Sequence, residues 1–121
     1  MGTTYTTEGE ELVVDLIDHS TSVTGWYISW GSGTVTDGKS STGLENEATE
    51  VRVTATTEDQ STTQTNRWIG IHTCGAATKT ISEAGLHTAA TDGSMPIIGT
   101  FTGIGLATDD QIQFTITLEQ T

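Results

Sequence analysis

The sequence predicts a mainly β protein: an antiparallel β-sandwich or jelly roll with one short N-terminal helix. The strongest observation is a last segment in which apolar and polar residues alternate strictly, as a half-buried antiparallel strand requires. Its apolar residues are Ile112, Phe114, Ile116 and Leu118. Turn-forming glycines and acidic residues separate several such segments at intervals of about a dozen residues, which is typical of sandwiches. Threonine, a strand-favouring residue, makes up roughly a fifth of the chain.

The length of 121 residues predicts a single domain spanning 1–121, long enough to bury its own core. The chain has 4 Lys and Arg against 16 Asp and Glu, and a net charge of -12 would repel a phosphate backbone, so we expect no nucleic-acid partner. No apolar run approaches the roughly 20 residues that span a bilayer, so we expect no membrane partner. Cys74 is the single cysteine, which excludes an internal disulfide.

The acidity also indicates an environment. Self-repulsion at this net charge destabilises a compact chain at low salt, whereas molar salt screens it. Acidic surfaces of this kind keep halophilic proteins soluble. We therefore expect a salt-loving host, with an ordinary acidic surface protein as the alternative.

The N-terminal part predicts an edge segment followed by a helix. Residues 1–7 either fray or pair along a sheet edge as an extended arm. Thr7 and Glu10 fit a capping box, and apolar residues then recur at helical spacing, so a helix is expected over about residues 8–18. Val13 and Val14 are weak helix formers, which leaves a strand as the alternative.

The middle of the chain predicts further strands. Trp26, Ile28 and Trp30 would share one face of a strand that ends at glycines. Residues 45–50 predict either a helical turn or an extended edge, solvated and holding one weak ion pair with Arg52. Alternation then predicts strands over residues 51–55 and 66–74, with a hairpin tip at 58–63 between them. We also expect a glycine-marked bend at 82–86 and turns at 91–94 and 109–110.

Residues that could carry chemistry are few. His72 and Cys74 resemble a metal pair or a nucleophile with its base, but zinc sites need a second close pair, and a nucleophile needs an orienting group. His19 and His87 are isolated. Clustered carboxylates at Asp92, Asp109 and Asp110 are weak calcium candidates, and acidic turns are the simpler interpretation. We therefore predict no catalytic residue, no metal, no cofactor and no enzymatic activity.

Two segments resemble a known group of proteins. Residues 79–86 (Lys-Thr-Ile-Ser-Glu-Ala-Gly-Leu) precede Gly99-Thr100-Phe101, Ile104, Leu106, Asp109-Asp110-Gln111-Ile112 and the alternating last strand. The earlier Trp30-Gly31-Ser32-Gly33-Thr34 is followed by Leu44, Glu47 and Arg52. In order and spacing these motifs resemble those of small virion structural proteins of tailed viruses. His87 departs from that pattern where many relatives have an aromatic residue, and Asp110 replaces a glycine of the terminal turn.

The resemblance implies a non-enzymatic virion component in the class of capsid decoration proteins, turrets, head fibres and tail accessories. We expect capsid decoration or turret first and a tail, baseplate or tail-fibre component second. The implied partners are the major capsid protein or other virion proteins, and the implied location is the virion, after assembly in the host cytoplasm. A carbohydrate-binding module that uses Trp26, Trp30 or Trp68 is the alternative of another class.

Small β-domains of this kind often act as trimers or other symmetric homo-oligomers, because symmetry multiplies weak contacts. Exposed strand edges pair with a neighbouring backbone without specialised side chains. The N-terminal segment and the terminal strand are the edges the sequence predicts. The expected contact residues are Thr3, Thr4, Tyr5, Thr6, Gln113, Thr115 and Thr117.

Overall fold

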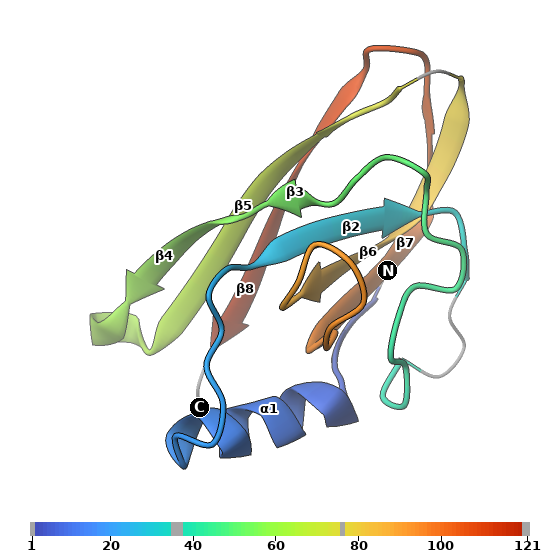
Figure 1. The fold of residues 1–121 in the computed structure, drawn as a ribbon. Helices are drawn as coiled ribbons and strands as arrows, with labels where there is room; N and C mark the ends of the chain where they lie inside the picture. The colour runs from blue at the N-terminus through green and yellow to red at the C-terminus, as the bar shows by residue number, and fades with distance from the viewer. Residues whose placement is uncertain (1, 35–37, 76, 120–121) are drawn as a thin grey trace.

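The computed structural model describes residues 2–34, 38–75 and 77–119, which form two antiparallel sheets and one N-terminal helix (Figure 1). One sheet has the strand order β1-β7-β6-β2-β3 and the other has the order β4-β5-β8, so the mainly β, sandwich-like prediction is confirmed. The elements are β1 (Gly2–Tyr5), α1 (Thr7–Ile17), β2 (Tyr27–Gly31), β3 (Val53–Thr54), β4 (Thr56–Gln60), the short 3-10 helix η1 (Ser61–Thr63), β5 (Thr65–Thr73), β6 (Lys79–His87), β7 (Ile97–Leu106) and β8 (Gln111–Glu119).

Two hydrophobic clusters form the core. Their buried members are Ile28, Trp68, Leu86 and Ile97 in one, and Trp30, Cys74, Ile81 and Leu106 in the other. Phe114 packs against both clusters, so β8 links them. The alternation predicted for β2, β5 and β8 therefore points the expected residues inward.

The helix α1 begins one residue earlier than predicted and lies across one end of the sandwich (Figure 1). Its N-cap is Thr6 and not Thr7: the Thr6 hydroxyl accepts a 3.0 Å hydrogen bond from the Gly9 amide and donates a 2.6 Å bond to the Met95 carbonyl. A Cβ atom at Gly9 would lie 2.5 Å from the Pro96 carbonyl oxygen. The cap thus requires a small residue where a capping box would place a long one.

The predicted arm pairs with the chain's own sheet. Gly2 lies opposite Thr100 and Tyr5 opposite Ile97 in the antiparallel β1–β7 ladder. Of the two interpretations offered by the sequence, edge pairing is the one the structure shows. Of the remaining residues of the arm, Thr6 and Thr7 belong to the cap and the first turn of α1, and Met1 lies outside the described residues.

The bend predicted at residues 82–86 is wrong, because these residues lie in β6, a central strand paired with both β2 and β7. Only a register shift between Ile81 and Glu83 interrupts the β6–β7 ladder. Gly85 serves packing here: a Cβ atom on it would lie 2.8 Å from the Met95 sulfur. A glycine needed for close approach was thus interpreted as a turn residue.

The strand predicted over residues 51–55 is shorter, and the hairpin tip lies later. Only β3 pairs with β2. The Ala55 amide then donates a hydrogen bond to the Trp26 carbonyl, and the chain continues as β4 in the other sheet. The tip is η1 with Gln64, whose φ is 52°. Val51, the first apolar residue of the predicted strand, is 85% exposed. A strand that changes sheets loses the single buried face on which the alternation rule depends.

Residues 45–50 form neither of the predicted alternatives; they are a loop held to β2 by an isolated Gly31–Glu47 bridge and by the Ala48 amide, which donates to the Trp30 carbonyl. The turns around 91–94 and 109–110 are confirmed. Asp92, Gly93 and Asp109 there have φ values of 54°, 72° and 74°. In the part of the chain that the structure describes, no helix has the length and apolar character needed to cross a bilayer.

Candidate interaction surface

One long side of the sandwich is formed by β1, β7 and β8, and we call it the open side. β8 is hydrogen-bonded only to β5, and β1 only to β7, among the strands described. β1 covers β7 only over residues 97–100, so the second half of β7 is also a free edge. Free edges present unpaired backbone N–H and C=O groups, which makes this side able to pair with another strand.

A groove of roughly 380 Å³ runs between the two sheets on the open side. The rings of Phe101 and Phe114, whose centroids are 6.2 Å apart, both line it. The other lining residues are small or aliphatic: Thr3, Ala84, Ile97, Gly99, Thr100, Thr115, Ile116 and Thr117. The groove can therefore receive apolar or hydroxyl-bearing side chains beneath a paired strand.

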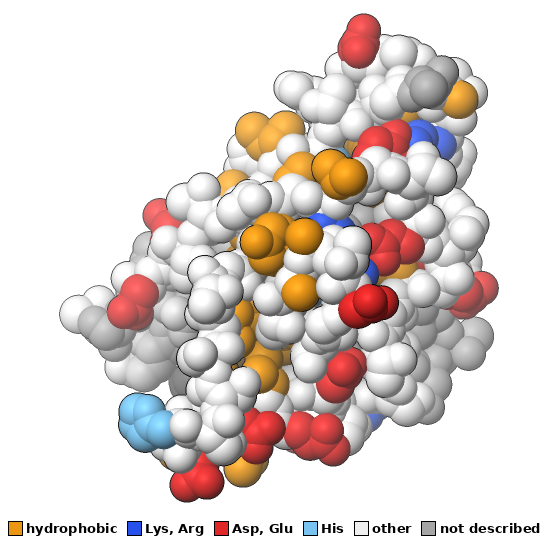
Figure 2. Space-filling view, viewed as in Figure 1, with side chains coloured by type: hydrophobic (Ala, Val, Ile, Leu, Met, Phe, Trp, Pro, Cys, Tyr) orange, Lys and Arg blue, Asp and Glu red, His pale blue; other side chains and the backbone are white. Residues whose placement is uncertain are grey.

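The open side carries almost no charge in a protein with a net charge of -12. Residues 2–6, 97–106 and 111–118 contain no Asp, Glu, Lys or Arg. Figure 2 shows a different face, on which acidic side chains line α1 and flank a band of hydrophobic side chains over β2 and β3. An acidic partner therefore meets the least repulsion at the open side.

The structure brings some of the predicted contact residues together. Thr3 lines the same groove as Thr115 and Thr117, although it lies more than a hundred residues before them in the chain. Gln113 is exposed on the same face of β8, and Thr4 lies opposite Ile98 in the β1–β7 ladder. Strand pairing, which sequence spacing does not give, creates this neighbourhood.

Two of the predicted contact residues serve the fold instead. Thr6 has no exposed surface because it caps α1, so its prediction as a contact residue is wrong. The Tyr5 hydroxyl donates a 3.1 Å bond to the Gly9 carbonyl, and burial together with the Glu10 charge raises the Tyr5 pKa. Sequence reasoning missed Phe101 and the free half of β7, although the absence of charge after Pro96 was a usable signal.

A buried carboxylate connects the motifs that carry the resemblance. Glu83 has no exposed surface and accepts three backbone hydrogen bonds, from the amides of Gly33 (3.0 Å), Glu45 (3.1 Å) and Asn46 (2.8 Å). We call this arrangement the Glu83 latch. A Cβ atom at Gly31 would lie 2.3 Å from the Asn46 carbonyl oxygen and 2.6 Å from Glu83 Oε2. The Trp-Gly-Ser-Gly segment and the Glu-Ala-Gly-Leu segment thus act together as one structural unit.

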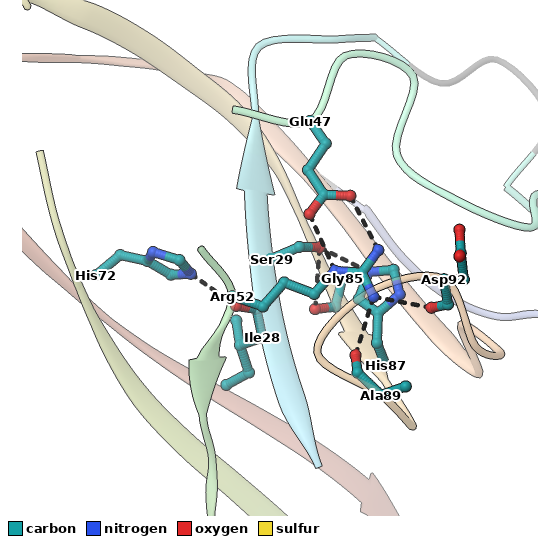
Figure 3. A network of polar contacts seen from close by, with 9 residues as sticks. All are labelled: Ile28, Ser29, Glu47, Arg52, His72, Gly85, His87, Ala89 and Asp92. Carbon is teal, nitrogen blue, oxygen red and sulfur yellow. Dashed lines mark hydrogen bonds and ion pairs between the residues drawn. The ribbon is translucent and has the colours of Figure 1, made fainter. Parts of the chain in front are cut away.

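The predicted ion pair of Arg52 is present, with Glu47 as its partner, but the solvated surroundings predicted for Arg52 are wrong. Its side chain is only 9% exposed and bonds Glu47 through two nitrogens, at 2.9 and 3.0 Å (Figure 3). It also donates to the carbonyls of Ala89 (2.9 Å) and Asp92 (2.8 Å). The hydrogen bonds from Arg52 lower the Glu47 pKa. Arg52 therefore fastens the 88–94 loop to the loop before β3.

Ser29 and His87 form the closest approach to a catalytic pair. Ser29 Oγ lies 2.7 Å from His87 Nε2, and both residues are 1% exposed (Figure 3). Burial, helped by the nearby Arg52 charge, lowers the His87 pKa to about 4. Because no surface of either residue is open to a substrate, this pair serves packing in the fold described here.

His72 and Cys74, the other chemical candidates, are also buried. His72 Nε2 lies 2.7 Å from the Ile28 carbonyl oxygen, its ring stacks on Trp30 at 4.6 Å, and burial lowers its pKa. The Cys74 thiol donates to the Ala77 carbonyl. His72 is thus held by the core and not by a reactive partner.

The carboxylates weighed for calcium do not meet. Asp92 precedes β7 and Asp109 and Asp110 follow it, so the ten-residue strand separates them (Figure 1). The Asp110 side chain accepts a 2.8 Å bond from the Ala107 amide within its own turn. Among the described residues, no three His, Cys, Asp or Glu side chains are grouped to hold a metal ion.

The tryptophans do not form an exposed platform for sugar rings. Trp30 is fully buried and Trp68 is 5% exposed. Trp26 is half-buried and packs on Trp68, with ring centroids 5.2 Å apart. The carbohydrate-binding alternative thus lacks the surface it requires.

In the comparisons with known proteins, no protein-family model matches this sequence, and no curated protein matches it.

Proposed function

We propose that this chain is a non-enzymatic structural protein of a virion, acting as a capsid decoration or turret component of a tailed virus with a halophilic host. The observation that carries the proposal is the open side, where free edge strands and a groove form a surface without charge. The resemblance of the Trp-Gly-Ser-Gly and Glu-Ala-Gly-Leu segments to small virion proteins supports it, since these segments are joined in the Glu83 latch.

Physical reasoning supplies the mechanism. A decoration protein adds to a site that is repeated over a shell, and backbone pairing at an edge gives affinity without dedicated side chains. The major capsid protein or another virion protein is the proposed partner. The acidic remainder of the surface keeps the assembled protein soluble in molar salt.

Immunogold labelling of purified particles, viewed by negative-stain electron microscopy, tests the proposal. Dense gold over the head supports decoration or turret, whereas gold confined to the tail replaces that assignment with a tail or baseplate component. Unlabelled particles, with the epitope shown to be accessible on detergent-opened particles, would overturn the virion proposal. An antibody against the β4–β5 tip suits this purpose, because β4 is the edge strand opposite β8 in the three-stranded sheet.

The proposal of a halophilic host has a separate test. Circular-dichroism melts in 0.1 and about 2 M KCl should show stabilisation by salt, since the Debye length falls to about 3 Å near 1 M and self-repulsion is screened. A melting temperature that does not rise with KCl would contradict a halophilic host, while leaving the location in the virion to the labelling experiment.

A further inference from the structure

We propose that two copies of this chain pair through β8, strand against strand and antiparallel, so that two three-stranded sheets become one six-stranded sheet. The occupant of the free β8 edge is then a second β8. This inference goes beyond a place in the virion, because it concerns the purified protein alone. Three observations lead to it: the length and regularity of the β8 edge, its self-complementary sequence and its lack of charge.

The sheet edges differ in length and charge. The free half of β7, residues 101–106, is uncharged but shorter than β8, contains two glycines and includes the register shift in the β6–β7 ladder. β1 has four residues, β3 has two, and β4 has five, of which Glu58 and Asp59 are acidic. β8 has nine residues with no proline, no lysine and no register shift in its ladder with β5. Charges, prolines, bulges and shortness are the devices that keep edges from pairing. β8 lacks all of them until Glu119 at its end.

The β8 sequence is self-complementary in the one antiparallel register that pairs all nine residues. That register centres on Thr115, which lies opposite its own copy. Gln113 then faces Thr117 of the partner, and Phe114 faces the partner's Ile116. Cross-strand Thr–Thr and aromatic–aliphatic pairs are favourable. Glu119 lies opposite Gln111 of the partner, so the two Glu119 carboxylates stay at opposite ends of the strand pair.

Charge selects a second copy of this chain as the occupant. Each copy carries -12, so an approach through any surface other than the open side brings acidic groups together. At the β8 edge both surfaces are uncharged over residues 111–118. The inward residues Ile112, Phe114, Ile116 and Leu118 are half-buried in the single chain, and a neighbouring strand covers the remainder of their apolar surface.

Sedimentation equilibrium on the purified protein in 0.1 and 2 M KCl is the first test. We expect a twofold dimer, in place of the trimer or ring expected earlier, and tighter association at high salt because screening weakens the long-range repulsion between copies while the interface itself is uncharged. A chain that remains monomeric at millimolar concentration in both salts would overturn the proposal, and would leave the open side to another protein.

Thr115→Lys places two ammonium groups opposite each other on the twofold axis and should weaken the dimer by more than about tenfold. Thr56→Lys is the matched control: Thr56 lies opposite Ile69 on the outward face of the same sheet, at the far edge, and should leave the dimer unchanged. Near-ultraviolet circular dichroism checks that both variants fold. Equal effects of the two lysines would contradict β8 pairing.

Cysteine cross-linking in a Cys74→Ala background tests the register. Thr115→Cys should form an intermolecular disulfide, because directly opposite Cα atoms are about 4.5–5.5 Å apart. Gln113→Cys should not, since the two copies of residue 113 lie about 13 Å apart along the strands. A mixture of Gln113→Cys and Thr117→Cys chains should cross-link as a heterodimer. Cross-linking of Gln113→Cys with itself would overturn the register.

These experiments use purified protein and no virus. The dimer proposal can therefore fail while the labelling of particles succeeds, and the labelling can fail while the dimer is confirmed.

Discussion

The two long sides of the sandwich differ in whether their polar groups have partners within the chain. On the side opposite the open side, the chain passes from β3 into β4 and the loop of residues 45–52 lies along β2; we call this the closed side. Its charged groups are bound within the chain. On the open side there is almost no charge, and backbone groups of β8 and half of β7 have no partner strand among the described residues.

Glu50 illustrates the closed side. Its carboxylate is bonded by the Lys79 ammonium, by the Gly75 amide at 2.8 Å and by Trp30 Nε1 at 3.3 Å. Burial alone would raise the Glu50 pKa, but the bonds from Lys79 and from backbone amides, with the Lys79 charge, lower it to about 2. The comparison shows that the acidic residues are of two kinds. A few stabilise the fold through hydrogen bonds and ion pairs, and the others add negative charge to the surface.

The Glu83 latch should give the largest effect on the closed side. Glu83→Ala removes a buried acceptor from three backbone amides and should lower the free energy of unfolding by about 4 kcal/mol. Urea unfolding in high salt measures it. Glu45→Gln, an exposed carboxylate in the same loop, is the control and should change little. Similar losses for the two variants would show that the latch does not hold the loop.

A pair of glycines compares the two sides directly. Gly31→Ala should cost about 3 kcal/mol, because its Cβ would overlap the Asn46 carbonyl in the packed loop. Gly105→Ala, on the free half of β7, meets nothing within 4 Å and should stay within about 0.5 kcal/mol of the parent. Thermal melts of both variants measure the contrast. A costly Gly105→Ala would mean that the open side is more tightly packed than described.

Acidification should lower the free energy of unfolding, mainly because His87 is buried in its neutral form. Its pKa falls from 6.5 to about 4 on folding, so the unfolded chain binds the proton more tightly. Stability is therefore complete above pH 6.5 and decreases as pH falls to about 4, by about 3 kcal/mol. His72, whose pKa is also lowered, adds to this loss, and Glu50 extends it from about pH 4.5 towards 2.

The measurement is urea unfolding between pH 7 and 4 for the parent and His87→Gln. The variant cannot take up a proton at this position and should lose the larger part of the slope. His19→Gln, at the exposed end of α1, is the control and should keep the parental slope. An unchanged slope in His87→Gln would contradict this assignment.

Arginine replacement should give the smallest of these effects. Arg52→Lys keeps the charge but loses the bidentate contact with Glu47 and the hydrogen bonds to two carbonyls. It should lower the free energy of unfolding by about 2 kcal/mol. Arg67→Lys, on a side chain that is 37% exposed beside Glu58, should cost under about 0.5 kcal/mol. Denaturant midpoints measure both. If the two substitutions are equivalent, Arg52 is no more than a surface ion pair.

Periodicity predicted the parts of the fold in which one face of a strand is buried throughout. β8 follows strict alternation, β5 alternates from Trp68 to Thr73, and α1 follows helical spacing, so their positions were available from the sequence. The bounds of β3 and β4 were not predicted correctly, because the chain changes sheets at Ala55 and the burial pattern is interrupted there. Gly85 was misassigned because a glycine gives the same local signal for a bend and for close packing against Met95.

The site was less predictable, because it depends on contacts between distant segments. Glu83 looked like one acid among many, and nothing near it in sequence indicates the amides of Gly33 and Asn46. Arg52 looked solvated because its two carbonyl partners lie in the 88–94 loop. By contrast, Thr115 and Thr117 were identifiable as surface residues, since an alternating strand shows its polar face directly.

The pairing of β1 with β7 has a consequence for how the chain folds during its synthesis. Gly2 lies opposite Thr100, and β2 pairs with β6, whose residues are more than fifty positions later. The five-stranded sheet therefore cannot close until β7 has left the ribosome. Such distant pairings raise the contact order, which places folding in the millisecond-to-second range and after most of the translation. Because β8 follows β7 in the chain, it is the last of the described strands to become available for pairing.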